Sequence, residues 1–285
     1  MNAISRHAEL PRAFPALFLS ACLLSSPALA TTISNGGYTA TDAIAFQWQE
    51  LGTPAKTPVA GATRVLGNDD DAFTGAIGLG FNFSFFNQTY NQAYITSNGM
   101  LTFGSSTTDN INTPLGGHMN VSTMPLIGVA WDDWTSTFSG TDGVYYQSFG
   151  VAGSRSFVVE WRDTKKFDTA SNSNSSPVSF EVVLYEASNA IEFRYLDMDT
   201  GGSSVNPDAS LGATATAGIR DANADINGRY LQWSHNQAVL AGGSSVLITP
   251  LAAVPEPASL ALLGLGIVGL GWVRGRGKKV TSRHA

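Results

Sequence analysis

Apolar residues at every second position, in short runs between turn residues, constrain the fold of this chain more than any other feature. The clearest run alternates through Ile77, Leu79, Phe81, Phe83 and Phe85, with small or polar residues between them. A period of two belongs to a β-strand with one buried face, and no window sustains the 3.6-residue period of an amphipathic helix. The sequence therefore predicts an all-β domain.

Turn residues separate these runs and place the strands between residues 44 and 248. Asn98-Gly99 predicts a hairpin, because both residues tolerate the positive backbone angles of tight turns, and residues 187–189 predict a second one. Residues 31–40 are expected to be a connector. Strands are expected at 44–48, 77–85, 93–96, 100–103, 125–131, 143–149, 157–161, 178–185, 191–196, 214–219, 230–234 and 246–248. Short strands between frequent turns indicate an antiparallel β-sandwich or barrel-like domain.

The N-terminus has the three parts of a secretory signal peptide over residues 1–30, expected to form a signal helix. Arg6 and Arg12 give a positive start, an apolar stretch follows, and Ala28-Leu29-Ala30 is a small-x-small cleavage site. An alternative stays open, because Leu19-Ser20-Ala21-Cys22 resembles a bacterial lipobox in which Cys22 is lipidated. Cleavage after Ala30 would remove the only cysteine, and the mature domain would then have no thiol or disulfide chemistry.

The C-terminus predicts a membrane anchor. Residues 258–273 are sixteen residues without a charge, and as a helix they would extend about 24 Å, somewhat less than a bilayer core of about 30 Å. A basic tail over residues 274–285 follows, with Arg274, Arg276, Lys278 and Lys279. By the positive-inside rule this tail stays in the cytoplasm and the rest of the chain lies outside.

The order of motifs in residues 251–285 resembles the PEP-CTERM sorting signal of Gram-negative bacteria. The segment 254–259 contains Pro255, Glu256 and Pro257, and the apolar span and the basic tail follow it. The resemblance implies that an exosortase, a membrane cysteine protease, recognises these three residues and that the tail is removed on sorting. It also implies a protein that is membrane-anchored before processing and then resides at the cell surface or in the extracellular polysaccharide matrix.

The exported region, residues 31–250, resembles a nidogen-like β domain. The resemblance lies in an ordered series of aromatic strand motifs, among them Phe81 to Phe86, Ile95 to Phe103 and Ile127 to Trp131. It implies an extracellular interaction module whose partners are extracellular polysaccharide or surface proteins, and it implies no catalysis. Alternatives are a calcium-dependent or carbohydrate-binding module and, less favoured, a glycan-active enzyme.

Charge and residue types exclude several functions. Between residues 31 and 254 there are nine Lys and Arg against twenty Asp and Glu, a net charge of −11, which opposes binding to nucleic acid. The only histidines there are His118 and His235, too few for a zinc site without cysteine. No Gly-x-Ser-x-Gly motif is present. We therefore expect no catalytic residues.

Calcium is the one metal that the sequence suggests. Asp221, Asn223, Asp225 and Asn227 place oxygen side chains at every second position, the spacing of a loop that wraps a hard cation. A poorer version includes Asp197, Asp199 and Asp208. We expect Asp132, Asp133 and the run Asp69–Asp71 to be solvated loop carboxylates. Side chains that could stack on sugar rings are Trp48, Trp131, Trp134, Trp161 and Trp233.

Overall fold

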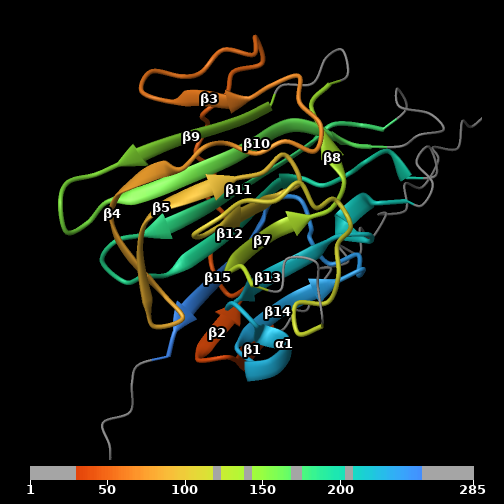
Figure 1. The fold of residues 1–285 in the computed structure, drawn as a ribbon. Helices are drawn as coiled ribbons and strands as arrows, with labels where there is room; N and C mark the ends of the chain where they lie inside the picture. Colours follow the sequence, from red (N-terminus) through yellow and green to blue (C-terminus); the bar gives the residue numbers. More distant parts are fainter. Residues whose placement is uncertain (1–29, 118–122, 138–142, 168–174, 203–207, 252–285) are drawn as a thin grey trace, which may run out of the picture. The chain divides into compact units, whose positions relative to one another are not determined.

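The computed structural model describes residues 30–117, 123–137, 143–167, 175–202 and 208–251 (Figure 1). Most of the predicted signal peptide and nearly all of the predicted sorting signal, residues 1–29 and 252–285, lie outside this range. No helix within the described part is long and apolar enough to cross a membrane. The predicted membrane helix at 258–273 falls among the residues that are not described.

Nearly all the regular secondary structure of the described chain is β-strand, which confirms the predicted all-β class. Its helical elements are the 3-10 turn η2 (Ser210–Gly212) and the single-turn helix α1 (Ala224–Asn227). The strands are β1 (Thr32–Asn35), β2 (Tyr38–Thr41), β3 (Thr63–Leu66), β4 (Ile77–Phe85), β5 (Gln88–Ile95), β6 (Met100–Thr102), β7 (Leu126–Trp131), β8 (Trp134–Thr135), β9 (Gly143–Phe149), β10 (Ser156–Lys166), β11 (Val178–Tyr185), β12 (Ile191–Asp197), β13 (Thr216–Arg220), β14 (Tyr230–His235) and β15 (Ser244–Pro250).

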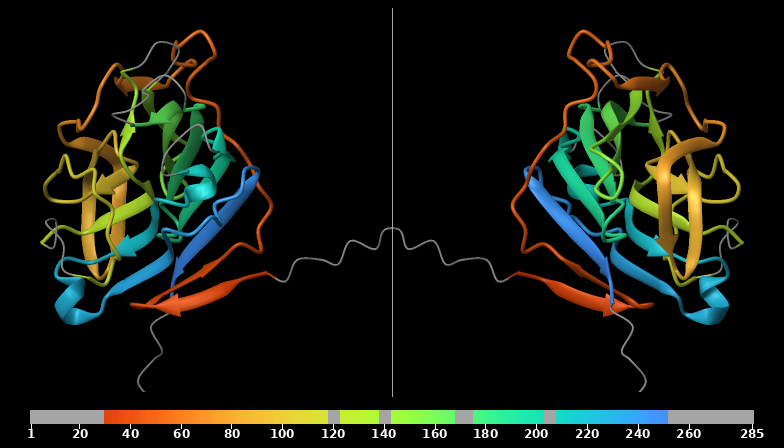
Figure 2. Two further views of the ribbon diagram at one scale, coloured as in Figure 1. Left: turned by 90° about the vertical axis from the view of Figure 1, so that its right-hand side faces the viewer. Right: turned by 90° about the vertical axis from the view of Figure 1, so that its left-hand side faces the viewer.

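The strands form two antiparallel sheets that face each other as the layers of a sandwich (Figures 1 and 2). The larger sheet has nine strands in the order β1-β2-β15-β12-β11-β10-β9-β3, with β8 paired to β10. The smaller sheet has six strands in the order β14-β13-β7-β6-β5-β4. The first and last strands of the domain are therefore separated only by β2, which pairs with both.

The core between the sheets is built from the inward side chains of the alternating strands. On β4 the burial alternates without a break, so that Leu79, Phe81, Phe83 and Phe85 are buried and the residues between them are exposed. Burying a large aromatic side chain contributes roughly 1.5–3 kcal/mol. The sequence pattern therefore explains why this segment is a strand and which face it buries.

Two buried aromatic residues also link the sheets through hydrogen bonds. Trp161 of β10 donates its Nε1–H to the carbonyl of Thr96 at 2.8 Å, and Tyr195 of β12 donates its hydroxyl to the carbonyl of Val129 at 2.8 Å. Both donors are fully buried. Because a hydrogen bond requires a particular distance and direction between donor and acceptor, these two pairs fix the position of the nine-stranded sheet relative to the six-stranded one.

The region before β4 differs from the prediction. The strand expected at 44–48 is wrong: residues 44–52, the strap, instead run in extended form across the outer face of the large sheet. Its apolar residues alternate because only one side of the strap packs against this face of the sheet. The connector expected at residues 31–40 is instead the hairpin of β1 and β2. Their polar sequence hid this hairpin, since an edge strand buries little apolar surface.

The hairpin between β5 and β6 confirms the prediction from Asn98-Gly99. Thr96 donates its backbone N–H to Met100 at 3.0 Å, and Gly99 has a positive φ of 74°. A Cβ on Gly99 would lie 2.5 Å from the carbonyl oxygen of Ala130 in β7. Glycine is therefore required here for two reasons, the left-handed backbone and the close approach of a neighbouring strand.

We expect Gly99→Ala to destabilise the domain more than Gly104→Ala. Both glycines have positive φ, but a Cβ on Gly104 meets no atom within 4 Å. Gly104→Ala, the control, should lower the free energy of unfolding by about 1–2 kcal/mol through backbone strain alone. Gly99→Ala should lower it by at least about 2 kcal/mol more, because a main-chain carbonyl must move. Chemical denaturation of both variants measures the difference. Equal losses would show that the contact with β7 does not matter.

Candidate functional site

The predicted sorting residues cannot be placed on the fold. Pro255, Glu256, Pro257, Arg274, Arg276, Lys278 and Lys279 lie outside the described residues, as does Ala28 of the cleavage site. Ala30 is described and exposed, immediately before Thr31 and β1. At the other end, β15 stops at Pro250. Three residues, Leu251 to Ala253, separate that strand from the predicted motif segment at Val254.

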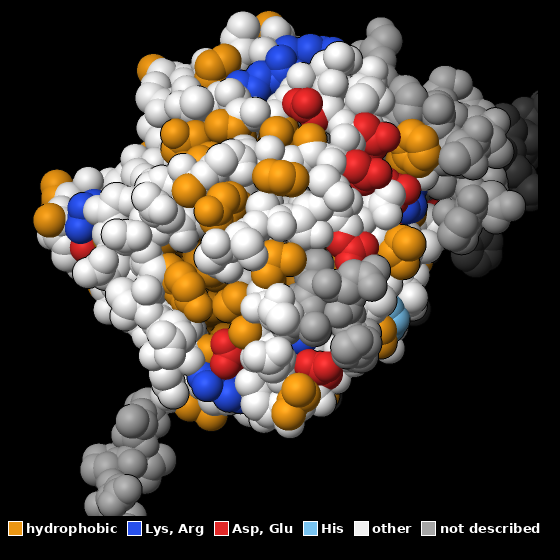
Figure 3. Space-filling model, in the orientation of Figure 1, with side chains coloured by type: hydrophobic (Ala, Val, Ile, Leu, Met, Phe, Trp, Pro, Cys, Tyr) orange, Lys and Arg blue, Asp and Glu red, His pale blue; other side chains and the backbone are white. Residues whose placement is uncertain are grey.

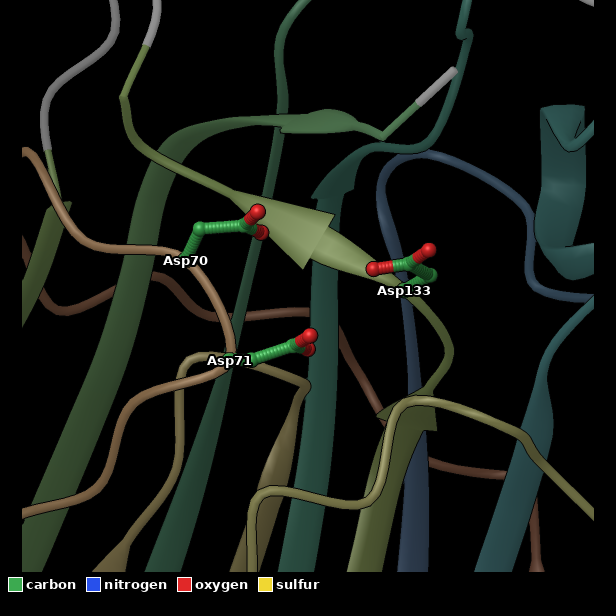
Figure 4. Close-up of side chains that lie close together, drawn as sticks. All are labelled: Asp70, Asp71 and Asp133. Atoms are coloured by element: carbon green, nitrogen blue, oxygen red, sulfur yellow. The ribbon is translucent and has the colours of Figure 1, made fainter. Parts of the chain in front are cut away.

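Asp70, Asp71 and Asp133 form a cluster that the sequence did not predict (Figure 4). One carboxylate oxygen of each lies within 4.8 Å of the others, which makes this trio the one group of three close ligand residues in the described part of the chain. Asp70 and Asp71 come from the loop between β3 and β4, and Asp133 from the link between β7 and β8. Asp133 lies over sixty positions after Asp71 in the sequence, so no local pattern indicated that the three are close together.

Asn98, at the tip of the β5–β6 hairpin, holds these two segments together. Its fully buried side chain donates from Nδ2 to Asp71 at 2.9 Å and accepts the backbone N–H of Trp134 at Oδ1 at 3.1 Å. Asn110 donates to the second oxygen of Asp71 at 3.0 Å. Two amide donors thus fix the Asp71 carboxylate in position.

Asp133 is poorly accommodated as an anion. Its Oδ1 is buried without a hydrogen-bond partner among the described atoms. Burial raises the pKa of Asp133 to about 6, Lys166 acts against this, and the charges of Asp71, Asp70 and Asp132 raise it further. Burial and the charge of Asp71 also raise the pKa of Asp70. The cluster can therefore hold a proton at mildly acidic pH, and its oxygens are of the kind that a divalent cation prefers.

The neighbouring Asp132 has the opposite environment. It is buried, its Oδ1 lies 2.7 Å from Nζ of Lys166, and the hydroxyl of Thr214 donates to its Oδ2 at 2.5 Å. Neither Asp132 nor Asp133 is the solvated loop carboxylate that we expected, and Asp71 is only partly exposed. The sequence cannot show this, because the burial comes from β10 and from the β5–β6 hairpin.

The predicted calcium loop folds into a compact turn. Asn223 has a left-handed backbone, and α1 follows at Ala224–Asn227. Asp221 pairs with Arg229 at 3.1 Å and Asp225 with Arg220 at 3.6 Å, while the side chain of Asn227 bonds to backbone atoms of the same turn. Two arginines thus compete with a cation for these oxygens. Calcium at Asp221, Asn223, Asp225 and Asn227 stays a prediction.

In the poorer candidate, Asp199 and Asp208 also bond within their own turn. Asp199 accepts the backbone N–H of Gly201 at 2.8 Å, and Asp208 accepts that of Ser210 at 2.9 Å. Hydrogen bonds from Ser210 lower the pKa of Asp208. These contacts are those of polar turns, and they bring Asp199 and Asp208 onto a shared serine, Ser210, rather than around an empty centre.

A second group of buried charges lies beneath the strap. Glu160 of β10 and Glu181 of β11 are directly opposed in the strand register and fully buried. Glu160 accepts the backbone N–H groups of Leu51 and Gly52 at 2.7 and 2.8 Å. Glu181 accepts that of Gln49 at 3.2 Å. The two carboxylates therefore anchor the strap to the sheet.

Burial dominates the electrostatics of this pair. It raises the pKa of Glu160 to about 7, against the effect of the two backbone donors and Arg162. It raises the pKa of Glu181 to about 8, although Arg194 lies 2.9 Å away and acts in the opposite direction. The alternation in β10 and β11 puts both glutamates on the outer face, but nothing in their spacing shows that a strap covers them.

The aromatic candidates for sugar stacking are mostly core residues. Trp131, Trp134 and Trp161 are fully buried, which leaves Trp48 and Trp233 as the partly exposed members of the predicted set. His235 lies 2.8 Å from the hydroxyl of Thr216 through Nδ1, and burial lowers its pKa. His118 is not among the described residues. Figure 3 shows several acidic side chains on the right-hand half of one face, with Lys or Arg side chains beside some of them.

Comparison with known proteins supports both resemblances found in the sequence. The family model described as NIDO related matches residues 34–256, which is most of the chain. The model described as PEP-CTERM protein-sorting motif matches residues 253–276. No curated protein and no solved structure matches.

We expect Asp133→Asn to stabilise the domain at pH 8 and to have little effect near pH 4. A carboxyl whose pKa is raised on folding contributes its stability below its unfolded value, near 4, and that contribution is lost as pH rises through about 6. The gain at pH 8 should be about 1–2 kcal/mol, after allowance for solvent screening. Thermal unfolding at both pH values measures it. Asp132→Asn is the contrast, because it breaks the pair with Lys166 and should destabilise at pH 8.

Calcium provides a second test that separates the two acidic sets. Millimolar calcium should raise the unfolding temperature at pH 7.5 if a set of carboxylates binds it, and a chelator should reverse the effect. Loss of the shift in Asp71→Asn, with the shift retained in Asp225→Asn, assigns the ion to the Asp70–Asp71–Asp133 cluster. The opposite pattern assigns it to the loop at 221–227. An unchanged unfolding temperature in the wild type excludes both.

Proposed function

Since this chain belongs to the NIDO-related family and carries a PEP-CTERM sorting motif, we propose that it is an exported protein whose β-sandwich has a structural or adhesive role outside the cell. An exosortase is the processing partner that the motif implies. The single observation that carries the proposal is the position of the motif, which begins three residues after β15, the last strand of the domain. A domain and a sorting signal are thus joined with almost no linker.

The short connection has a physical consequence before processing. A helix that begins at residue 258 would be joined to β15 by the seven residues 251–257, which span at most roughly 25 Å when extended. A C-terminal helix at 258–273 would therefore hold the domain close to the membrane surface, and the basic tail would keep that helix oriented with its end in the cytoplasm. Export would begin at the predicted signal peptide, with cleavage after Ala30. Removal of the tail would then release the domain to the cell surface or matrix of a Gram-negative bacterium.

A binding role is favoured over catalysis by the state of the most perturbed carboxylates. Glu160 and Glu181 have raised pKa values, as acid–base residues often do. Both are fully buried, and both accept hydrogen bonds from backbone N–H groups of the strap. Anchoring the strap accounts for their burial without a substrate.

Calcium-dependent binding is the second candidate function. The observation that favours it is the convergence of Asp70, Asp71 and Asp133 from two loops that are far apart in the sequence. An ion there would neutralise three clustered carboxylates and join the β3–β4 loop to the β7–β8 link. The calcium titration described above distinguishes this function from a purely structural domain.

Processing is tested by the mass of the C-terminal peptide of protein recovered from its native host. We expect a terminus near Pro257, with residues 260–285 absent. Glu256→Ala should leave the tail attached, because it removes the only charge of the Pro-Glu-Pro triplet. Ala252→Ser, just before the motif, is the matched control and should be processed normally. An intact Ala285 in the wild type would refute sorting by cleavage.

A further inference from the structure

One end of the sandwich contains a partly open hollow, to which the family comparison assigns no ligand. Four turns and the end of β15 surround it: the β1–β2 turn, the β4–β5 turn, the β11–β12 turn and the segment between α1 and β14. Its volume is about 550 Å³, within the range of roughly 300–1,000 Å³ that is usual for small-molecule sites. Loops gathered at one end of a β-sandwich are a common place for ligand binding, because a rigid scaffold positions them.

Two asparagines present unused amide groups to this hollow. Asn87 and Asn189 line it, and both have left-handed backbones, with φ of 66° and 52°. Asn189 accepts the backbone N–H of Ser84 at 2.7 Å through Oδ1. Among the described residues, the Nδ2 group of Asn189 and the whole side chain of Asn87 have no assigned protein partner. Free donors and acceptors thus sit on two turns whose backbones are fixed.

The cation in the hollow is already neutralised. Arg229 lies 3.1 Å from Asp221, its Cζ is 5.4 Å above the ring of Phe86, and its Nη2 donates to the carbonyl of Phe86. Arg229 is therefore positioned as part of the wall and has little charge to offer an anion. The net charge of −11 between residues 31 and 254 also opposes acidic ligands.

The rest of the wall adds a phenol and an apolar surface. The hydroxyl of Tyr38 accepts the backbone N–H of Phe86 at 3.0 Å, and burial raises the pKa of Tyr38, so it stays neutral and keeps its own proton to donate. Leu251 is 55% exposed and lines the same hollow. A ligand that fits is uncharged, carries several hydroxyl groups and has a small apolar face.

We propose that this hollow binds a sugar unit of a neutral polysaccharide, through the amides of Asn87 and Asn189. An amide offers a donor and an acceptor side by side, which matches the adjacent hydroxyls of a sugar ring. The inference rests on the proposed adhesive function and names its ligand. It also gives that function a geometry, because the sugar would be bound beside Leu251, where the chain leaves β15 towards its sorting signal.

The experiment measures binding of cellotetraose and maltotetraose to the full chain in detergent by calorimetry. Asn87→Asp and Asn189→Asp keep a side chain that accepts left-handed geometry, and Asn189→Asp keeps the acceptor for Ser84, but both remove an amide donor. We expect binding to at least one of the two sugars and a loss of at least tenfold in each variant. Asn68→Asp is the control, since Asn68 is exposed, has φ of 67° and lies outside the hollow.

Three results would overturn the proposal. They are failure of the wild type to bind either neutral sugar, unchanged binding in both asparagine variants, and preference for an acidic probe such as an alginate tetramer or a peptide of residues 254–259. Unfolding temperatures of all variants show whether they are folded, and Asn87→Gly, which tolerates the positive φ of this position, serves if Asn87→Asp is not. C-terminal masses of the same variants report sorting separately, so normal processing without sugar binding would refute this inference and leave the proposed function intact.

Discussion

The hydrogen bonds that Trp161 and Tyr195 donate across the core determine how the rest of the domain is arranged. Apolar packing alone would let one sheet slide over the other, since dispersion forces have little directional preference. A buried indole or phenol that needs one particular carbonyl removes that freedom. Trp161 reaches Thr96 at the base of the β5–β6 hairpin, so the position of Asn98 at its tip, and of the aspartates around it, depends on this contact.

The outer face of the large sheet meets a different requirement. Glu160, Glu181 and Arg194 are neighbours across three strands, and a row of charges on a sheet would ordinarily face water. Here the strap covers them, and its backbone N–H groups donate hydrogen bonds to both glutamates. A small apolar cluster of Leu51, Tyr145, Val158 and Val183 packs beside them. Replacing a glutamate would therefore leave unpaired donors on the strap as well as an altered sheet.

Local patterns were sufficient for the parts of the fold that bury one face of one strand. The alternation in Ile77–Phe85 and the turn at Asn98-Gly99 correctly predicted β4 and the β5–β6 hairpin. The strap could not be distinguished from a strand, because Ile44, Phe46 and Trp48 alternate for either structure. The cluster of Asp70, Asp71 and Asp133 was missed for a related reason: contacts between distant loops leave no periodic trace, and a run of aspartates usually indicates a solvated turn.

The place of β15 in the sheet determines how the domain would bear mechanical tension. It is an interior strand, paired with β2 on one side and β12 on the other, and it leads directly to the C-terminal tail. A pull on the tail acts along the strand, so hydrogen bonds of both ladders are sheared together instead of opening one at a time. A tether on the edge strand β1 would have a ladder on one side only. If the sorting signal tethers the domain, tension on the tail would therefore be shared by the two ladders that β15 forms with β2 and β12.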